Sequence, residues 1–162
     1  MKCTNCSSPM SKTITRYHYK ECGLRNVHLD GVALWKCHEC GEEELDIHEI
    51  EMLHHIIATF LAGKTTRLKP EEIRFMRVHL GFSGSDFARA ISVKPETVSR
   101  WENDPKHEMN LSNEKLLRLM ILAKLGPFTD YQKLREFGKD SSKTSKRMSF
   151  QTTTSGWKSS AA

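Results

Sequence analysis

Four of the five cysteines form two Cys-x-x-Cys pairs, Cys3/Cys6 and Cys37/Cys40, with thirty residues between the pairs. Two such pairs can supply four thiolates to one tetrahedral ion, and structural zinc prefers this ligand set. Four thiolates fill the coordination sphere of Zn2+ and leave no position for a water or a substrate. We therefore expect one structural zinc ion per chain, with chance pairing or a redox dithiol as the alternative.

The other residues that could carry chemistry do not form a catalytic constellation. Cys22 lies in a Glu-Cys-Gly context, and we interpret it as a buried or loop thiol, with a fifth metal ligand as the alternative. His38 lies between the cysteines of the second pair, where side chains point away from the metal. The histidines lack the orienting partner that nucleophilic catalysis needs, and the sequence has no glycine-rich phosphate loop. We therefore expect that the protein is not an enzyme.

The charge of the chain is unevenly distributed along its 162 residues. Residues 1–58 contain six Lys/Arg and nine Asp/Glu, residues 64–138 contain fourteen and ten, and residues 139–162 contain five and one. An acidic head on a basic body indicates two different partners, and the basic part suits nucleic acid. No run of eighteen apolar residues occurs, so we expect no membrane span. No secretory signal precedes Cys3, which predicts a cytoplasmic protein, associated with the nucleoid when it binds DNA.

The segment between the cysteine pairs has the pattern of a small β-sheet. Residues 14–19 are rich in β-branched and aromatic side chains, and 27–29 and 32–34 flank Asp30-Gly31, which predicts a two-residue hairpin turn. So small a sheet buries too little to fold with certainty without the metal. Apolar residues at helical spacing then predict a helix from about His48 to Gly63.

The fold class predicted is α+β, a zinc-pinned β domain followed by an all-α domain. The predicted divisions are a zinc-binding domain over 1–62, a linker over 63–69, a helical DNA-binding domain over 70–138 and a disordered basic tail over 139–162. Within the helical domain, apolar spacing and Gly/Pro punctuation predict four helices and a short terminal one. They cover residues 71–80, 84–91, 95–103, 112–124 and 131–137.

Residues 84–102 have the layout of a helix-turn-helix. Ala88 is small where the two helices cross, Ser92 occupies the turn, and Val98 fills the core from the second helix. A recognition helix beginning at Pro95 exposes side chains to base edges in the major groove. Arg100 can bind guanine, Glu96 can accept from cytosine, and Thr97 can contact a thymine methyl or a phosphate. A helical bundle that only looks like this motif is the alternative.

This stretch resembles the Cro/C1-type (XRE) DNA-binding domain over roughly 68–125, with Thr-Val-Ser-Arg-Trp-Glu at 97–102 as the most specific signature. Ser92 stands where that family usually has Gly, so a serine must adopt a positive φ. Gly84 stands where the family usually has a phosphate-binding Gln. Phosphate contacts are therefore assigned to Ser83, Ser85, Arg89 and Lys94.

The order of a four-cysteine head and an XRE domain resembles the MqsA-type antitoxins, in which a YgiT-type zinc finger precedes the helix-turn-helix. The resemblance implies a homodimer that represses its own operon by binding double-stranded operator DNA, and a zinc domain that binds a cognate toxin. Glu96 departs from the amide side chain expected at a base-reading position, and the basic tail is not part of that pattern. A zinc-stabilised XRE-type regulator without a toxin is the alternative.

Overall fold

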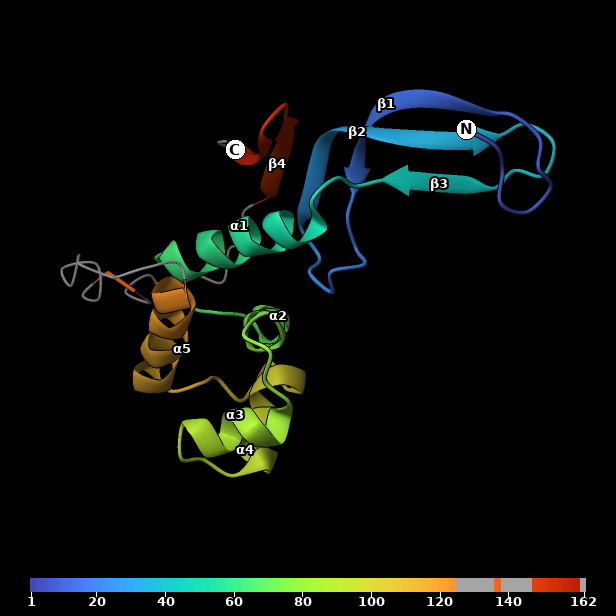
Figure 1. Cartoon of the computed structure of the whole chain (residues 1–162). Helices are drawn as coiled ribbons and strands as arrows, with labels where there is room; N and C mark the ends of the chain where they lie inside the picture. Colours follow the sequence, from blue (N-terminus) through green and yellow to red (C-terminus); the bar gives the residue numbers. More distant parts are fainter. Residues whose placement is uncertain (125–135, 138–146, 161–162) are drawn as a thin grey trace. The chain divides into compact units, whose positions relative to one another are not determined.

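A computed structural model describes residues 1–124, 136–137 and 147–160, which form parts of two compact units (Figure 1). The first unit contains Met1–Lys20, Arg25–Leu53 and Lys146–Ala162, and the second contains Glu21–Leu24 and His54–Ser145. A β-sheet in the first unit and helices in the second confirm the α+β fold class. The division between the units falls inside helix α1 (Ile50–Gly63), earlier in the chain than the expected boundary at residue 62.

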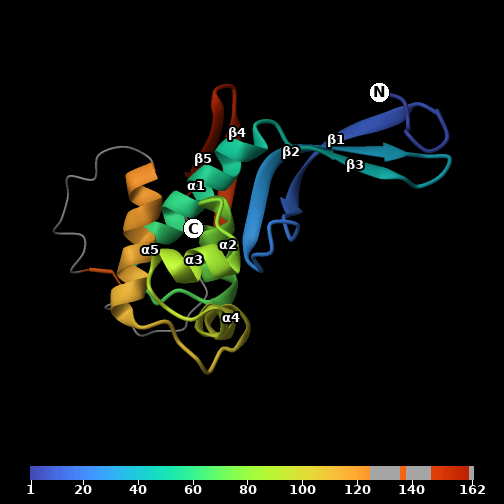
Figure 2. The same cartoon turned by 60° about the horizontal axis from the view of Figure 1, so that its bottom comes forward.

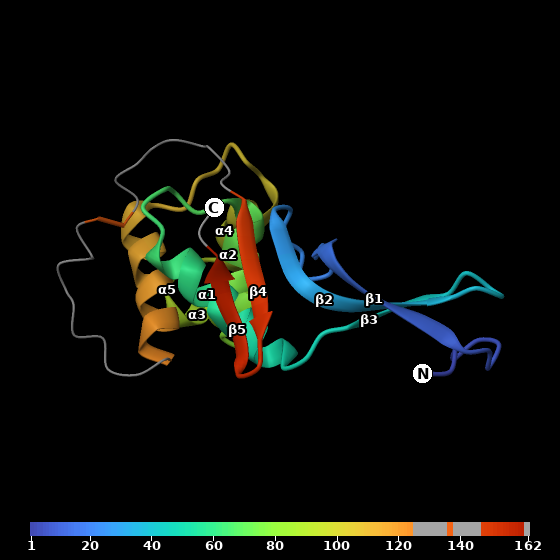
Figure 3. The ribbon, with the colours of Figure 1, turned by 90° about the horizontal axis from the view of Figure 1, so that it is seen from above.

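The first unit is built on one sheet with the order β1-β2-β4-β5 (Figure 3). Its central strand β2 (Val27–Cys37) pairs antiparallel with β1 (Met10–His18) along its whole length. The other edge of β2 is divided between two partners. β3 (Glu43–Asp46) pairs antiparallel with its second half, and β4 (Met148–Thr153) pairs parallel with residues 27–30 of its first half. β5 (Gly156–Ser160) completes the sheet beside β4.

Asp30-Gly31 does not form the predicted hairpin turn. β2 runs straight through these residues, and the register with β1 shifts there, because Val32 faces Thr15 while Asp30 faces Arg16. Gly31, with φ of +81°, is thus the extra residue of a β-bulge. A Cβ at Gly31 would also lie 3.1 Å from Cγ2 of Thr152 on β4. A glycine with positive φ suits a β-bulge as well as a turn. The strand that pairs with β2 here is β1, residues 10–18, and not the second arm of a hairpin at Asp30-Gly31.

The end of the chain is the largest departure from expectation. The expectation of a disordered tail over 139–162 is wrong for residues 148–160, which form the β4–β5 hairpin of the first unit. Met148, Phe150 and Trp157 are buried, and the Trp157 indole donates a hydrogen bond to the His48 carbonyl at 2.7 Å. These few apolar side chains lie at strand spacing against a sheet already formed by distant residues. The Ser/Thr/Lys-rich composition of the segment makes these apolar residues hard to recognise as strand residues in the sequence.

The second unit confirms the four predicted helices to within about one residue at each end (Figure 2). Their observed bounds are Pro70–His79 for α2, Gly84–Ala90 for α3, Pro95–Asn103 for α4 and Leu111–Lys124 for α5. Buried side chains from each helix form the core, among them Ile73, Phe87, Val98, Leu117 and Ile121. The predicted helix over 131–137 falls almost wholly outside the described residues.

The segment expected to be a linker, residues 63–69, is bound to α5. The Arg118 guanidinium is fully buried and donates hydrogen bonds to the carbonyls of Leu61, Ala62, Lys64 and Thr66, at 2.5–3.2 Å. Glu114 receives bonds from Arg118 at 2.7 Å and from Arg67 at 2.7 Å. The buried ion pair therefore holds the end of α1 and the following segment on the helical unit.

Candidate metal centre and nucleic-acid interface

The two Cys-x-x-Cys pairs converge at one end of the sheet. Each pair lies in a tight turn, in which Ser7 N–H donates to the Cys3 carbonyl at 3.0 Å and Gly41 N–H donates to the Cys37 carbonyl at 3.1 Å. Ser7 and Gly41 both have positive φ, of +62° and +76°. These turns direct the two sulfurs of each pair to the same side, and β1 and β2 bring the turns together.

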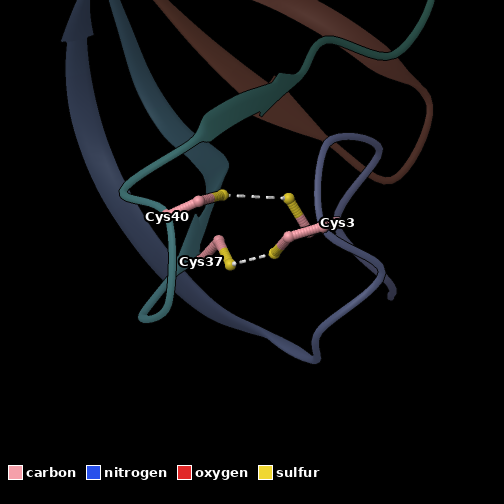
Figure 4. Close-up of side chains that lie close together, drawn as sticks. Cys3, Cys37 and Cys40 are labelled. Carbon is pink, nitrogen blue, oxygen red and sulfur yellow. Dashed lines mark hydrogen bonds between the residues drawn. The ribbon is translucent and has the colours of Figure 1, made fainter.

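The four sulfur atoms all lie within 4.8 Å of one another. The Sγ atoms of Cys3 and Cys40 are 3.5 Å apart (Figure 4). Those of Cys6 and Cys37 are 3.4 Å apart. A zinc ion with sulfurs at about 2.3 Å needs S–S separations of about 3.8 Å in a tetrahedron, whereas a disulfide bond is about 2.05 Å long. The donor set and its spacing therefore fit a tetrathiolate metal site.

The thiols in this cluster have divergent proton affinities. Hydrogen bonds from the side chain and backbone of Ser8 lower the pKa of Cys6 to about 6. The Glu42 backbone hydrogen bond lowers the pKa of Cys40, but the neighbouring thiols of Cys3, Cys6 and Cys37 outweigh it and raise that pKa to about 12. Four adjacent thiolates repel one another, and a divalent cation removes that repulsion while displacing the remaining protons.

Little apolar packing supports the metal end of the sheet. Cys3, Met10 and Cys37 form a small buried cluster, and Trp35 packs against it. Two of its three members, Cys3 and Cys37, belong to the four-sulfur group, so most of this cluster exists only if the cysteine turns are in place. Cys22 lies outside the four-sulfur group, and burial raises the pKa of its thiol.

The helix-turn-helix has the predicted geometry at its turn. Ser92 has φ of +57°, and Val93 N–H closes the turn by donating to the Ala88 carbonyl at 2.9 Å. Ala88 and Val98 are buried where the two helices pack, as is Trp101. The chain therefore keeps a serine in a left-handed conformation, because the packing of α3 against α4 requires that turn.

The proposed DNA-contacting side chains lie on and beside α4, and most are exposed. Lys94, Glu96 and Arg100 are exposed and Thr97 is half-buried. Arg89 on α3 is exposed and forms an ion pair with Asp86 at 3.2 Å. Ser85 is also exposed at the start of α3. The exposed residues Glu96 and Arg100 thus place one carboxylate and one guanidinium on the surface of α4.

Ser83 has a structural role that was not predicted, although Ser83-Gly-Ser-Asp86 has the Ser-x-x-Asp spacing of a helix cap. Its hydroxyl caps α3 by accepting from the Asp86 N–H at 3.0 Å, and it donates to the Asp86 carboxylate at 2.6 Å. A hydroxyl donates only one hydrogen bond, so a phosphate contact from Ser83 would compete with Asp86. Among the residues predicted to bind phosphate, Lys94 and Arg89 offer charge, and Arg89 has further N–H donors besides the one that binds Asp86.

A buried clamp that sequence reasoning missed holds the recognition helix in place. Arg77 on α2 binds both carboxylate oxygens of Glu102 on α4, at 2.5 and 2.9 Å, and donates to the Phe82 carbonyl at 2.6 Å. Both side chains are nearly inaccessible, at 11% and 7% exposure. The pair joins α2, the α2–α3 turn and α4 around one bidentate contact. An Arg and a Glu 25 residues apart give no local signal of such pairing.

The helix-turn-helix family matches residues 73–122, the stretch from α2 to α5. That match and the turn geometry agree on the same residues. Residues 73–122 form a DNA-binding helix-turn-helix. The matched stretch covers about a third of the chain and lies entirely within the second unit. No curated protein and no solved structure matches the chain. Among the helices in the described ranges, none has the length and apolar character to cross a bilayer.

Proposed function

We propose that this chain is a sequence-specific transcriptional repressor that binds its operator as a homodimer and acts as the antitoxin of a type II toxin–antitoxin pair. The observation that carries the DNA-binding part is the helix-turn-helix match over 73–122 together with the exposed Arg100 and Glu96 on α4. The four-sulfur cluster supports a zinc-stabilised first unit, with the ion in a structural role. Both activities suit a cytoplasmic protein.

The assignment of toxin binding to the zinc unit rests on the order of the two units and on charge. The chain end changes the charge of the first unit, because Arg147 and Lys158 belong to that unit. With them, the described part of that unit has eight Lys/Arg and eight Asp/Glu, so it is not acidic as a whole. Its acidic character is concentrated in one stretch, residues 39–51, which contains seven Asp/Glu and no Lys/Arg. Toxins that act on RNA carry basic surfaces, which this stretch would attract.

The experiment that tests the antitoxin role separates it from DNA binding. The full chain carrying Arg100→Ala should still rescue cells from a growth-arresting protein encoded by the adjacent gene, and should copurify with that protein. Residues 1–62 alone are not suitable, because they lack the β4–β5 hairpin that completes the sheet. If the neighbouring product is harmless, or binds only the helical unit, the protein is a zinc-stabilised regulator without a toxin.

A further inference from the structure

The outer edge of β3 is open in the part of the chain that the structure describes. β3 pairs with β2 from Glu43 opposite Lys36 to Asp46 opposite Ala33, and no strand among the described residues pairs with its other side. An open edge presents backbone N–H and C=O groups that can pair with a strand of another chain. β1 and β5 are also paired on one side only within the described ranges, so charge must decide which edge a partner selects.

β3 differs from the other two edges in the sign of its charge. Glu43, Glu44 and Asp46 lie on it, whereas β1 carries Lys12 and Arg16 and β5 carries Lys158. Lys36 forms an ion pair with Glu43 at 2.8 Å, and the neighbouring Glu42 and Glu44 are exposed. Like charges directly opposite one another disfavour pairing of β3 with β3 of a second copy, whereas a cationic strand is attracted.

A strand added to β3 would meet different side chains on the two faces of the sheet. The rows Lys12–Trp35–Glu44 and Ile14–Ala33–Asp46 lie on the same face, because side chains two residues apart along a strand point the same way. Leu45 points to the opposite face, where it lies across from Leu34 on β2, and both side chains are half-buried. An added strand with alternating basic and apolar side chains would place the basic ones on the face of Glu44 and Asp46 and the apolar ones on the face of Leu45.

We propose that β3 is the docking edge for an extended, basic strand of a partner protein, which pairs with its backbone and places cationic side chains beside Glu42 and Glu44. This inference rests on the proposed antitoxin function for the identity of the partner, the toxin, but not for the chemistry of the edge. Backbone pairing supplies the affinity, and the carboxylates select the sign of the partner's charge.

A peptide of alternating Lys and Val, about seven residues long and blocked at both ends, tests the edge directly with the zinc-loaded full chain. We expect this peptide to shift the backbone amide resonances of residues 43–46. A second peptide of the same sequence, N-methylated at alternate amides, should bind at least about tenfold more weakly, because N-methylation removes the N–H donors that pair with β3. The double variant Glu42→Lys/Glu44→Lys should lose about tenfold in affinity, with less loss at high salt.

Glu51→Lys is the matched control, since it reverses an exposed charge in the same acidic stretch but on α1. It should change the peptide affinity less than about twofold. Glu51→Lys reverses one charge and the double variant two, so a free-energy loss from Glu51→Lys of about half that of the double variant, or more, would show a diffuse electrostatic attraction and overturn the docking edge. Shifts confined to β1 or β5, or equal binding of the N-methylated peptide, would overturn it as well.

Binding of the neighbouring gene product to the wild-type chain and to the double variant distinguishes an error in the β3 docking edge from an error in the antitoxin function. If the neighbouring gene product binds the wild-type chain and the double variant equally, the β3 edge is wrong and the antitoxin function stands. If that product does not bind the wild-type chain at all, the antitoxin function fails, and the peptide measurements alone decide the edge.

Discussion

Replacement of Trp157 by Ala should unfold or severely destabilise the first unit, although Trp157 lies in a polar segment rich in Ser, Thr and Lys. The side chain is 5% exposed, and its indole N–H donates to the His48 carbonyl at 2.7 Å. Loss of a buried Trp side chain costs about 3–5 kcal/mol. A small domain has a total stability of about 5–15 kcal/mol, so the loss is a large part of what holds the sheet together.

Two control variants divide this cost into its parts. Trp157→Phe keeps most of the ring and removes the N–H, so it should cost about 1–2 kcal/mol, from the lost hydrogen bond and a smaller ring. Lys158→Ala changes the exposed neighbour on β5 and should lie within about 0.5 kcal/mol of wild type.

Hydrogen exchange locates the effect, because the amides that β2 and β4 share lie in residues 27–30 of β2. In Trp157→Ala these amides should exchange far faster than in wild type, while those of α2 and α5 keep their protection. The role assigned to the hairpin is refuted if Trp157→Ala unfolds at the same urea concentration as Lys158→Ala, with unchanged protection in residues 27–30.

Three further predictions concern the metal, the buried ion pair and pH. Cys37→Ser should remove the single bound zinc and unfold the metal end of the sheet while residues 73–122 stay folded, measured by metal analysis and circular dichroism; full zinc retention would contradict it. Arg118→Met should destabilise the helical unit by about 3–5 kcal/mol, because Glu114 and four carbonyls lose a buried partner, and an unchanged melting temperature would refute this role. Burial, with smaller contributions from Lys124, His55 and His54, lowers the pKa of His79 to about 4. Since the unfolded chain then binds more protons between about pH 6.5 and pH 4, the helical unit should lose stability as the pH falls through that window, and His79→Gln should flatten the slope; an equal slope in both proteins would show that His79 is not responsible.

The sequence was most informative where structure depends on neighbours along the chain. Helix bounds in the second unit followed from apolar spacing and from Pro70 and Pro95 at first turns, and the positive φ of Ser92 followed from its place in the motif. The four-cysteine site was also predictable from the sequence. Each turn is marked by its own Cys-x-x-Cys spacing, and one tetrahedral ion requires the four thiolates of both pairs.

Features that depend on distant residues were not predictable from the sequence. Gly31 fits a turn or a bulge equally well, and only the pairing of its neighbours with Thr15 and Arg16 decides between them. The tail lacks enough apolar residues to fold alone, yet Phe150 and Trp157 are buried against a sheet made by residues far earlier in the chain. The ion pair of Arg77 and Glu102 likewise has no local signal in the sequence, because the two residues meet only when α2 packs against α4.

The most direct test of the central claim is binding of the zinc-loaded full chain to DNA from its own promoter, compared with Arg100→Ala and Lys94→Ala at several salt concentrations. We predict a footprint with two-fold symmetry, which Arg100→Ala weakens by about 1–3 kcal/mol at its own site and hardly at all on unrelated DNA. Lys94→Ala should instead weaken binding to all sequences and reduce the salt dependence. If Arg100→Ala binds the promoter as tightly and as selectively as wild type, α4 is not the recognition helix.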